Sequence, residues 1–386
     1  MTAGSALVPA RAPADAALEA ALGALAAAGA ERADLALVFC TGDVFPAAPA
    51  ILHAVRRVTG ARVVVGCSGA GVLTEAGEIE GEPSLALLVV RDERLVATPF
   101  LVEDLAAAGD ALGAEVAARV SATVAEGGAL VVLPDARGLE PRALLDGLEA
   151  ELGFLPVTGA VAAGPTLFEL CNADTAQGGL AGLALSGTRP VVGVAQGCVP
   201  IGEPYVVTRA EGRVVREIGG RPALVVLREA VAAVPGGAER AARAGIFAGI
   251  AIDPAKSPLE RGDFLVRSLV GADPASGALA LAEPVRVGQT IQFQLRDAAA
   301  ARDDLEAMLA DVARRLGGRR PAFGCYFNCA GRGAGLYGEP AHDVTRIRAR
   351  LGAFPLVGFF GNGEFAPVGR RNFFHTYTGA LAVFPA

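Results

Sequence analysis

The sequence predicts an α/β protein that contains parallel or mixed sheets, an antiparallel insert and two associated domains. Three segments repeat one order of elements: a buried strand, a helix of about three turns, a second buried strand and a further apolar strand. Strands of near-continuous apolar residues on either side of a helix are typical of βαβ units, whose two strands are parallel and connected with a right hand. Strands of alternating polarity between the second and third segments predict the antiparallel insert.

The elements of the three segments follow each other with similar spacing. Gly66 and Leu85 are 19 residues apart, whereas Gly159 and Ala181, and likewise Gly358 and Ala380, are 22 residues apart. The predicted strands and helices are 33–40, 49–60, 63–71 and 84–90 in the first segment, 129–135, 141–153, 156–164 and 180–186 in the second, and 322–328, 341–352, 355–364 and 378–384 in the third.

The remaining chain predicts a helix at its beginning and a mixed insert. An alanine-rich helix is expected near 14–28, and Ala300 to Leu316 form an amphipathic helix with charges on its outer face. Residues 1–30 are therefore predicted to be an N-terminal helical extension, 31–222 a first domain and 223–386 a second. The insert is predicted as a hairpin at 198–220 that turns at 210–212, a helix at 223–234, and strands at 245–252, 263–284 and 289–297.

Composition excludes several classes of protein. Of the 386 residues, 52% are hydrophobic and 19% are charged, so the chain is expected to fold rather than stay disordered. A net charge of -7 without a lysine- or arginine-rich face argues against a nucleic-acid partner. No apolar stretch is long enough to span a bilayer, and no apolar core follows a basic start as in a signal peptide. We therefore expect a cytoplasmic protein without membrane insertion, whose six cysteines are reduced and buried.

Polar residues gather on the glycine-rich loops that follow the predicted strands. In parallel sheets these loops carry the binding site. Arg332 and Glu364 lie on two of them, and a guanidinium and a carboxylate together suit the two ends of an α-amino acid. The competing interpretation is that Arg332 caps carbonyls or pairs with Glu339. The loops in question are 41–48, 66–77, 135–140, 159–166, 328–340 and 358–370.

Several blocks of the sequence, in the right order, resemble the FIST sensory proteins. The resemblance extends over roughly Asp34 to Phe384 and includes both the N-terminal and the C-terminal FIST regions. The blocks are GCSGAG (66–71), QGCVPIGEP (196–204), VTRAEGRVVREIGGRPAL (207–224), GDFLVRSLVGADPASGAL (262–279), QFQLRDAAAA (292–301), NCAGRG (328–333) and GFFGNGEFAP (358–367).

This resemblance implies intracellular sensing of a small polar metabolite, such as an amino acid, in signal transduction. No output module accompanies the two regions, so a separate signalling protein is expected to receive the signal. The chain departs from the family at Thr158 and Pro165, where the family usually has a glycine and an acidic residue, which weakens a ligand role for that loop. The predicted ligand-binding residues are Cys67, Ser68, Asn328, Cys329, Arg332, Gly333, Asn362, Glu364 and His375.

An enzyme remains the alternative to a sensor, with Cys67, Ser68 or Cys329 as the nucleophile of a hydrolase or a thiol-dependent reaction. Ser68 follows a strand, but the G-x-S-x-G pattern fails at Ala70. GAGLYG (333–338) fits the spacing of a dinucleotide fingerprint but lacks the acidic residue at the end of the following strand, so no cofactor is expected. The three histidines are scattered, which predicts no metal site.

Overall fold

The computed structural model describes residues 1–386, which form two compact units. The first unit contains 1–194, 305–374 and 378–386, and the second contains 195–304 and 375–377. The first unit holds three six-stranded sheets, and the second holds one seven-stranded sheet. The α/β class, the mixed sheets and the antiparallel insert are thus confirmed.

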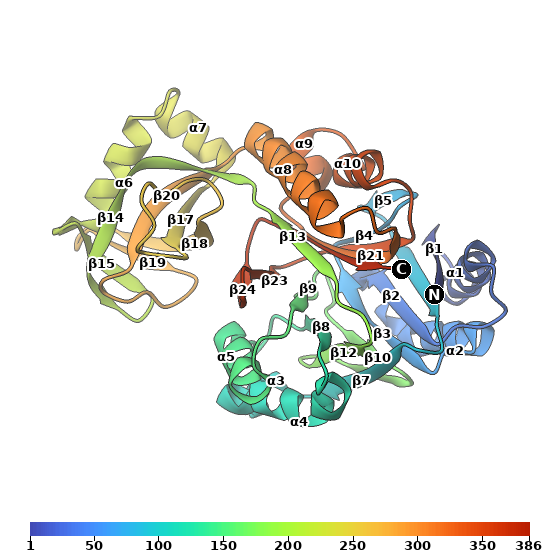
Figure 1. Cartoon of the computed structure of the whole chain (residues 1–386). Helices are drawn as coiled ribbons and strands as arrows, with labels where there is room; N and C mark the ends of the chain where they lie inside the picture. The colour runs from blue at the N-terminus through green and yellow to red at the C-terminus, as the bar shows by residue number, and fades with distance from the viewer. The chain divides into compact units, whose positions relative to one another are not determined.

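The three predicted repeats form the first unit, and each is longer than the sequence indicated (Figure 1). Each repeat starts with an edge strand and a helix that precede the predicted segment. The first repeat contains β1 (Thr2–Pro9), α1 (Pro13–Ala28), β2 (Leu35–Thr41), α2 (Ala48–Thr59), β3 (Val63–Gly69), the hairpin β4 (Gly71–Thr74) and β5 (Gly77–Glu80), and β6 (Ser84–Arg91).

The second repeat follows the same order without interruption. It contains β7 (Val96–Val102), α3 (Leu105–Ala108), α4 (Leu112–Val124), β8 (Gly128–Pro134), α5 (Pro141–Leu152), β9 (Val157–Ala160), the hairpin β10 (Glu169–Cys171) and β11 (Asp174–Ala176), and β12 (Leu180–Ser186).

The third repeat is interrupted by the second unit after its edge strand. It contains β13 (Val191–Ala195), then α8 (Ala298–Leu316), β21 (Pro321–Cys329), α9 (Gly333–Tyr337), α10 (His342–Leu351), β22 (Leu356–Gly361), the hairpin β23 (Glu364–Val368) and β24 (Arg371–His375), and β25 (Gly379–Pro385).

The three sheets have one common strand order. The order in the first sheet is β1-β6-β2-β3: the edge strand of the repeat, then its last strand, then its first and second strands, the two on either side of α2, which are parallel. The second and third sheets have the same order, β7-β12-β8-β9 and β13-β25-β21-β22, with the same parallel pair. The position beside the second strand is taken by a hairpin from another repeat. β10 pairs with β3, β23 pairs with β9, and β4 pairs with β22, all antiparallel. The hairpins are therefore exchanged around a cycle of three repeats.

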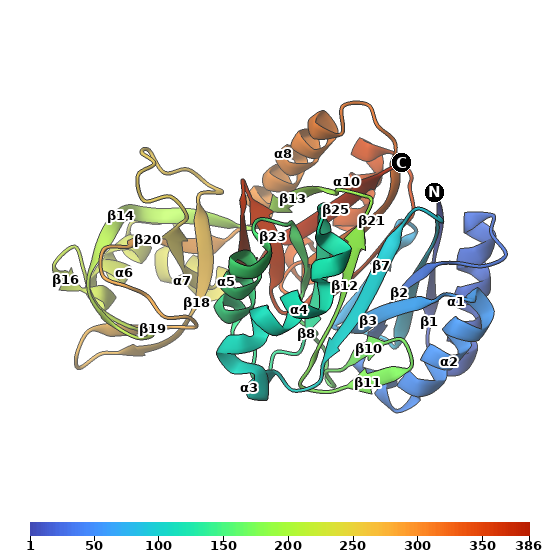
Figure 2. The ribbon, with the colours of Figure 1, turned by 60° about the horizontal axis from the view of Figure 1, so that its bottom comes forward.

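The three sheets form one unit because they share a hydrophobic core. Inward-facing residues of all three, such as Phe39, Leu133 and Phe327, belong to one continuous buried core. The outward face of the first sheet is covered by α1 and α2, and that of the second by α4 and α5 (Figures 1 and 2). Because both faces are covered, the strands are apolar throughout, as the sequence showed.

The second unit is an antiparallel sheet that turns back on itself. β14 pairs with β20 and also with β15, so the strand order closes. The predicted hairpin and helix are confirmed as β14–β15 and α6. The elements are β14 (Cys198–Glu211), β15 (Val214–Ile218), β16 (Arg221–Pro222), α6 (Ala223–Ala232), α7 (Gly237–Ala244), β17 (Ile246–Ala251), β18 (Phe264–Asp273), β19 (Ala278–Leu281) and β20 (Thr290–Arg296).

Two sequence expectations were wrong in detail. The predicted loops 66–77 and 358–370 are largely strand, because the ends of β3 and β22 and the exchanged strands β4 and β23 lie in them. Glycines such as Gly66 and Gly358 are required by close packing, whereas Gly363 and Gly369 have positive φ angles. The first ten residues contain β1, which pairs with β6 and was not predicted. No helix of the structure combines the length and the hydropathy that crossing a bilayer requires.

One glycine in each repeat allows the first and second strands to approach. A Cβ added to Gly66, Gly159 or Gly358 would lie 1.7, 1.9 or 1.8 Å from a carbonyl oxygen of the neighbouring strand. The carbonyls belong to Val38, Val132 and Tyr326. No side chain can be accommodated at such a separation without moving the backbone.

We predict that Gly358→Ala lowers the free energy of unfolding by about 3 kcal/mol or prevents folding, since the added methyl group meets backbone that belongs to the core. Gly335→Ala in α9 is the matched control, because no atom lies within 4 Å of its added Cβ. Urea unfolding of both variants measures the difference. Equal stability of the two would contradict the close approach of β21 and β22.

Candidate functional site

A cluster of buried polar side chains lies where β21 ends. We call it the Arg332 cluster; its members come from β21, the segment around α9 and the first turn of α10. All of its side chains are buried. Its members are Tyr326, Arg332, Tyr337, His342 and Asp343.

Arg332 and Asp343 form the centre of this cluster. Nε and Nη2 of Arg332 donate to Oδ2 of Asp343 at 3.3 and 3.2 Å, and Nη2 also donates to the Tyr337 hydroxyl at 2.5 Å. The side chains of Arg332 and Asp343 are 1% and 0% exposed. An ion pair this deeply buried is maintained only when hydrogen bonds compensate the loss of water.

The two charges stabilise each other strongly. Burial by itself favours the neutral forms, but the Asp343 carboxylate raises the pKa of Arg332 above its usual value. Burial likewise opposes ionisation of Asp343, yet the Arg332 charge and hydrogen bonds from His342 and Tyr326 hold the pKa of Asp343 well below its usual range. Both groups are therefore charged at all ordinary pH values.

The remaining contacts of the cluster fix its geometry. The Tyr326 hydroxyl donates to Asp343 Oδ2 at 2.7 Å, and Nδ1 of His342 lies 2.9 Å from Oδ1. The His342 ring stacks on Tyr337 with ring centres 3.8 Å apart. Gly379 leaves room for the Tyr326 ring, since an added Cβ would lie 2.0 Å from the hydroxyl oxygen.

Asn328 lies next to this cluster and is not satisfied by it. Its side chain is fully buried, yet neither the amide nitrogen nor the amide oxygen has a hydrogen-bond partner. Leaving a buried polar group unpaired costs about 1–3 kcal/mol, so such groups are rare in folded proteins. Asn328 therefore offers one donor and one acceptor to a group that is not part of the chain.

Glu364 is a second unsatisfied group, at the start of the exchanged strand β23. Its Oε2 accepts hydrogen bonds from the hydroxyl and the backbone N–H of Thr378 at 2.6 and 3.3 Å, whereas Oε1 has no partner. Burial raises the pKa of Glu364 to about 8, although Thr378 and the Arg332 charge act in the opposite direction. Glu364 is therefore mostly protonated at neutral pH.

The position of Glu364 occurs once in every repeat. Each of the three second strands has one equivalent residue that pairs with the exchanged hairpin. Phe359 pairs with Val72, Cys67 pairs with Glu169, and Ala160 pairs with Glu364. Glu169 resembles Glu364 closely, because it is fully buried and its Oε1 also has no partner. The first repeat has an apolar residue at this position.

Glu169 lies close to a second carboxylate. Its Oε2 accepts from the N–H of Gly179 at 3.2 Å, while Asp135 accepts from the Arg137 guanidinium at 2.6 and 3.1 Å. Burial and then the Asp135 charge raise the pKa of Glu169 to about 9. Despite its burial, Asp135 has a lowered pKa, because Arg137 and the N–H groups of Arg137 and Gly178 stabilise its charge.

Two further carboxylates reach the Arg332 cluster from the exchanged hairpin β4–β5. Burial and the Asp343 charge raise the pKa of Glu78 to about 8, and Oε1 of Glu78 accepts from the N–H of Val344. Oε1 of Glu80 accepts from the N–H of Ala334 at 3.0 Å. A Cβ on Gly333 would lie 2.5 Å from the Glu80 carboxylate, so this glycine permits the contact.

The structure places the predicted site residues in different surroundings. Asn328, Cys329, Arg332 and Gly333 are brought together at the end of β21, and Glu364 is near enough for the Arg332 charge to act on it. The hypothesis that Arg332 pairs with Glu339 is wrong, because Asp343 is its partner.

The other predicted residues are Asn362, His375, Cys67 and Ser68. Asn362 is exposed, and its backbone N–H donates to Val161. His375 is buried at the end of β24 and is grouped with the second unit. Cys67 and Ser68 are buried in β3, beside the Glu169 strand. No three histidine, cysteine or acidic side chains are arranged to hold a metal ion.

The two nucleophiles of β3 show no activation. Burial is the main cause that raises the pKa of the Cys67 thiol well above its usual value, and the Glu169 carboxyl is the second cause. The raised pKa disfavours the reactive thiolate. The Ser68 hydroxyl accepts a hydrogen bond from the N–H of Phe168 at 3.2 Å. An activated serine would instead donate to a neighbouring base.

Sequence reasoning missed Asp343, Glu169 and Tyr326. Glu169 had a signal, since it is a single charge within the apolar run LFELC, and an isolated charge in a buried strand needs a partner or a function. Asp343 had none, because an aspartate in the first turn of a helix is common and stabilises the helix dipole.

We predict that Arg332→Met lowers the free energy of unfolding by about 3–5 kcal/mol, because it leaves the buried Asp343 charge without its partner. Arg314→Ala is the matched control: Arg314 pairs with Asp311 at the surface, where an ion pair contributes about 0–1 kcal/mol. Urea unfolding at pH 7 compares them. A free energy of unfolding for Arg332→Met close to that of the native chain would show that the pair does not stabilise the fold.

We also predict that Glu169→Gln and Glu364→Gln reduce the loss of stability between pH 5 and pH 8. The unfolded chain releases these protons near pH 4.5, whereas the folded chain retains them up to pH values of about 9 and 8. The native free energy of unfolding should therefore fall as the pH rises through this window. Urea unfolding at several pH values tests this, with the exposed Glu149→Gln as the control. An unchanged slope in both variants would contradict buried, protonated carboxyls.

Comparison with solved structures gives only weak likenesses. The crystal structure of cyanuric acid hydrolase from A. caulinodans matches with a TM-score of 0.27 at 14% identity, and 48% of this chain and 70% of that chain are covered. A chorismatase structure matches with a TM-score of 0.32 at 12% identity, over 100% of this chain and 98% of that chain. Neither likeness supports a statement about activity.

Sequence comparison identifies the family. Uncharacterized proteins of Mycobacterium tuberculosis and Mycobacterium bovis are each 36% identical over 340 residues, which is 86% of this chain and 86% of each relative. The sequence models of the FIST N domain and the FIST C domain match 34–221 and 223–367. FIST domains are associated with sensing and signal transduction. The predicted division at 222 stays a prediction, and the compact units divide elsewhere. The chain belongs to the FIST family and contains both its N and its C domain.

Proposed function

We propose that this protein is a sensor that binds a small metabolite of the amino-acid class at the end of β21. The observation that carries the proposal is Glu364, a fully buried carboxyl with one unpartnered oxygen and a pKa of about 8. Perturbed carboxyls of this kind are concentrated at functional sites.

Asn328 supplies the second recognition group. It lies opposite Gly379 in the β21–β25 ladder, directly beside Thr378, the residue that holds Glu364. An α-amino acid presents an ammonium and a carboxylate a short distance apart. The ammonium pairs with the Glu364 carboxylate, and the carboxylate accepts from the Asn328 amide nitrogen.

Arg332 has a positioning role in this proposal instead of a direct ligand contact. Its donors are already directed to Asp343 and Tyr337, and withdrawing them would leave a buried carboxylate unpaired. Its charge still facilitates ionisation of Glu364, because it lowers the pKa of that carboxyl.

The α9 segment is the part that moves in this proposal. It is only five residues long, and Gly333, Gly338 and Ala341 around it have positive φ angles of 58°, 75° and 54°. It is held by the Tyr337 and Ala334 contacts described above. Ligand entry displaces α9, and a separate signalling protein reads the displacement.

A thermal-shift screen tests the proposal directly, because a ligand that binds only the folded state raises the melting temperature. The panel contains L-amino acids, the corresponding organic acids without the amine, and the corresponding amines without the carboxylate. An amino acid is expected to give a dose-dependent shift that Glu364→Gln abolishes and Glu149→Gln retains. Glutamine has the shape of the protonated carboxyl, so Glu364→Gln is expected to fold. Shifts that persist in Glu364→Gln would refute the site.

We predict that the affinity for the amino acid rises with pH, by about tenfold for each unit below pH 8, because the ammonium pairs with the ionised form of Glu364. Calorimetric titration at pH 6, 7 and 8 in two buffers of different ionisation enthalpy measures the affinity and the proton released. An affinity that is independent of pH over this range, without proton release, would exclude Glu364 as the partner of the ammonium.

A further inference from the structure

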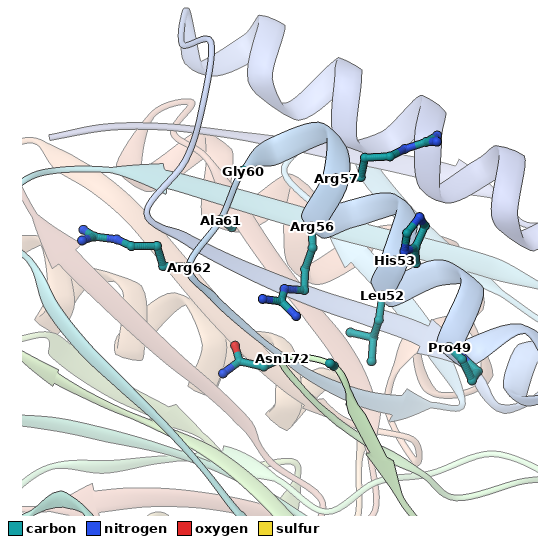
Figure 3. Close-up of a pocket in the computed structure, with 10 residues that line it drawn as sticks. Pro49, Leu52, His53, Arg56, Arg57, Gly60, Ala61, Arg62 and Asn172 are labelled. Carbon is teal, nitrogen blue, oxygen red and sulfur yellow. The ribbon is translucent and has the colours of Figure 1, made fainter.

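The first unit also contains an open depression of about 630 Å³ on its surface (Figure 3). One side is formed by α2 and the residues that follow it, and the other by the turn between β10 and β11. Its lining includes Leu52, Arg56, Arg62 and Asn172. Figure 3 shows Arg56 and Leu52 extending from α2 toward the turn that carries Asn172, whereas Arg57 extends to the opposite side.

The charge of this depression contrasts with that of the chain. Three arginines and His53 line it, and no acidic side chain does, although the chain has a net charge of -7. Arg56 is exposed and has no ion-pair partner. Arg62 contacts Asp34 at 3.1 Å, but both oxygens of Asp34 already accept from Arg91 at 2.7 and 2.6 Å. The depression therefore has an excess of positive charge.

The opposite wall contributes a fixed hydrogen-bond donor. Asn172 has a φ of 56°, its backbone N–H donates to Val64 O at 2.7 Å, and its side-chain Oδ1 accepts from the Val64 N–H at 3.1 Å. These two bonds tie the residue to the end of β3. Since the oxygen of the amide is engaged there, its nitrogen is the group left to donate to a guest.

The ligand class follows from this combination. Guanidinium groups with unused donors and an amide N–H suit the oxygens of a phosphate group. Pro49, which is exposed, offers an apolar surface beside the charges, which an inorganic ion cannot use. We propose that this depression binds a phosphate monoester of metabolite size, with the phosphate at Arg56, Arg62 and Asn172 and the organic part on Pro49.

The proposal is independent of the amino-acid site, so the two can fail separately. The probe is phenyl phosphate, titrated calorimetrically into the whole chain at low ionic strength, with inorganic phosphate for comparison. We expect saturable binding of phenyl phosphate that is tighter than that of inorganic phosphate and weakens with added salt. Arg56→Ala and Arg62→Ala should each weaken it about tenfold, as expected for loss of a charge-assisted hydrogen bond.

Arg142→Ala is the matched control, because it removes the same charge from an exposed side chain on α5 that does not line the depression. It should leave the affinity within about twofold, and Arg56→Lys should retain part of it because the charge remains. Equal weakening by Arg142→Ala and Arg56→Ala would show that only the net charge of the chain governs binding of the anion, and would overturn the site. Absence of saturable binding to the native chain would overturn it as well, as would equal affinity for phenyl phosphate and inorganic phosphate.

Discussion

The exchange of hairpins among the three repeats is the constraint on which the first unit depends. No repeat completes its own sheet, because the position beside its second strand is filled by a hairpin of another repeat. The three sheets can therefore close around their common core only when all repeats are folded. The first and second strands of every repeat approach closely at one equivalent glycine of the second strand.

The same exchange creates the polar sites. In each repeat, one residue at or near the start of the hairpin lies opposite the equivalent residue of a second strand. In two repeats this residue is a glutamate whose one oxygen is held by the following strand and whose other oxygen is unpartnered. In the first repeat it is Val72. Equivalent backbone positions have thus acquired different chemistry, and the third repeat has added Arg332 and Asp343 beside its glutamate.

The Arg332 cluster and Glu364 differ in a way that bears on sensing. In the cluster, every charge is compensated within the chain, so its energy favours the arrangement that the chain adopts without a ligand. Glu364 and Asn328 are buried without full compensation, so a ligand that supplies the missing partners gains binding energy that the unliganded chain lacks. The charges of Arg332 and Asp343, which do not change over the ordinary pH range, lie beside these two unsatisfied groups and support selective recognition.

The sequence by itself determined the class of the fold, the three repeats, the parallel strand pairs and the antiparallel insert, because hydrophobic periodicity and helix length are local properties of the chain. It also indicated that Arg332 and Glu364 belong to the same end of the molecule. Only the tertiary structure decided that glycine-rich segments predicted as loops are exchanged strands, since the pairing of β4 with β22 joins residues that are far apart in sequence. For the same reason, the sequence did not reveal that Asp343 is the partner of Arg332, or that Glu169 and Glu364 occupy equivalent positions. Both depend on how distant segments pack together, which no local pattern encodes.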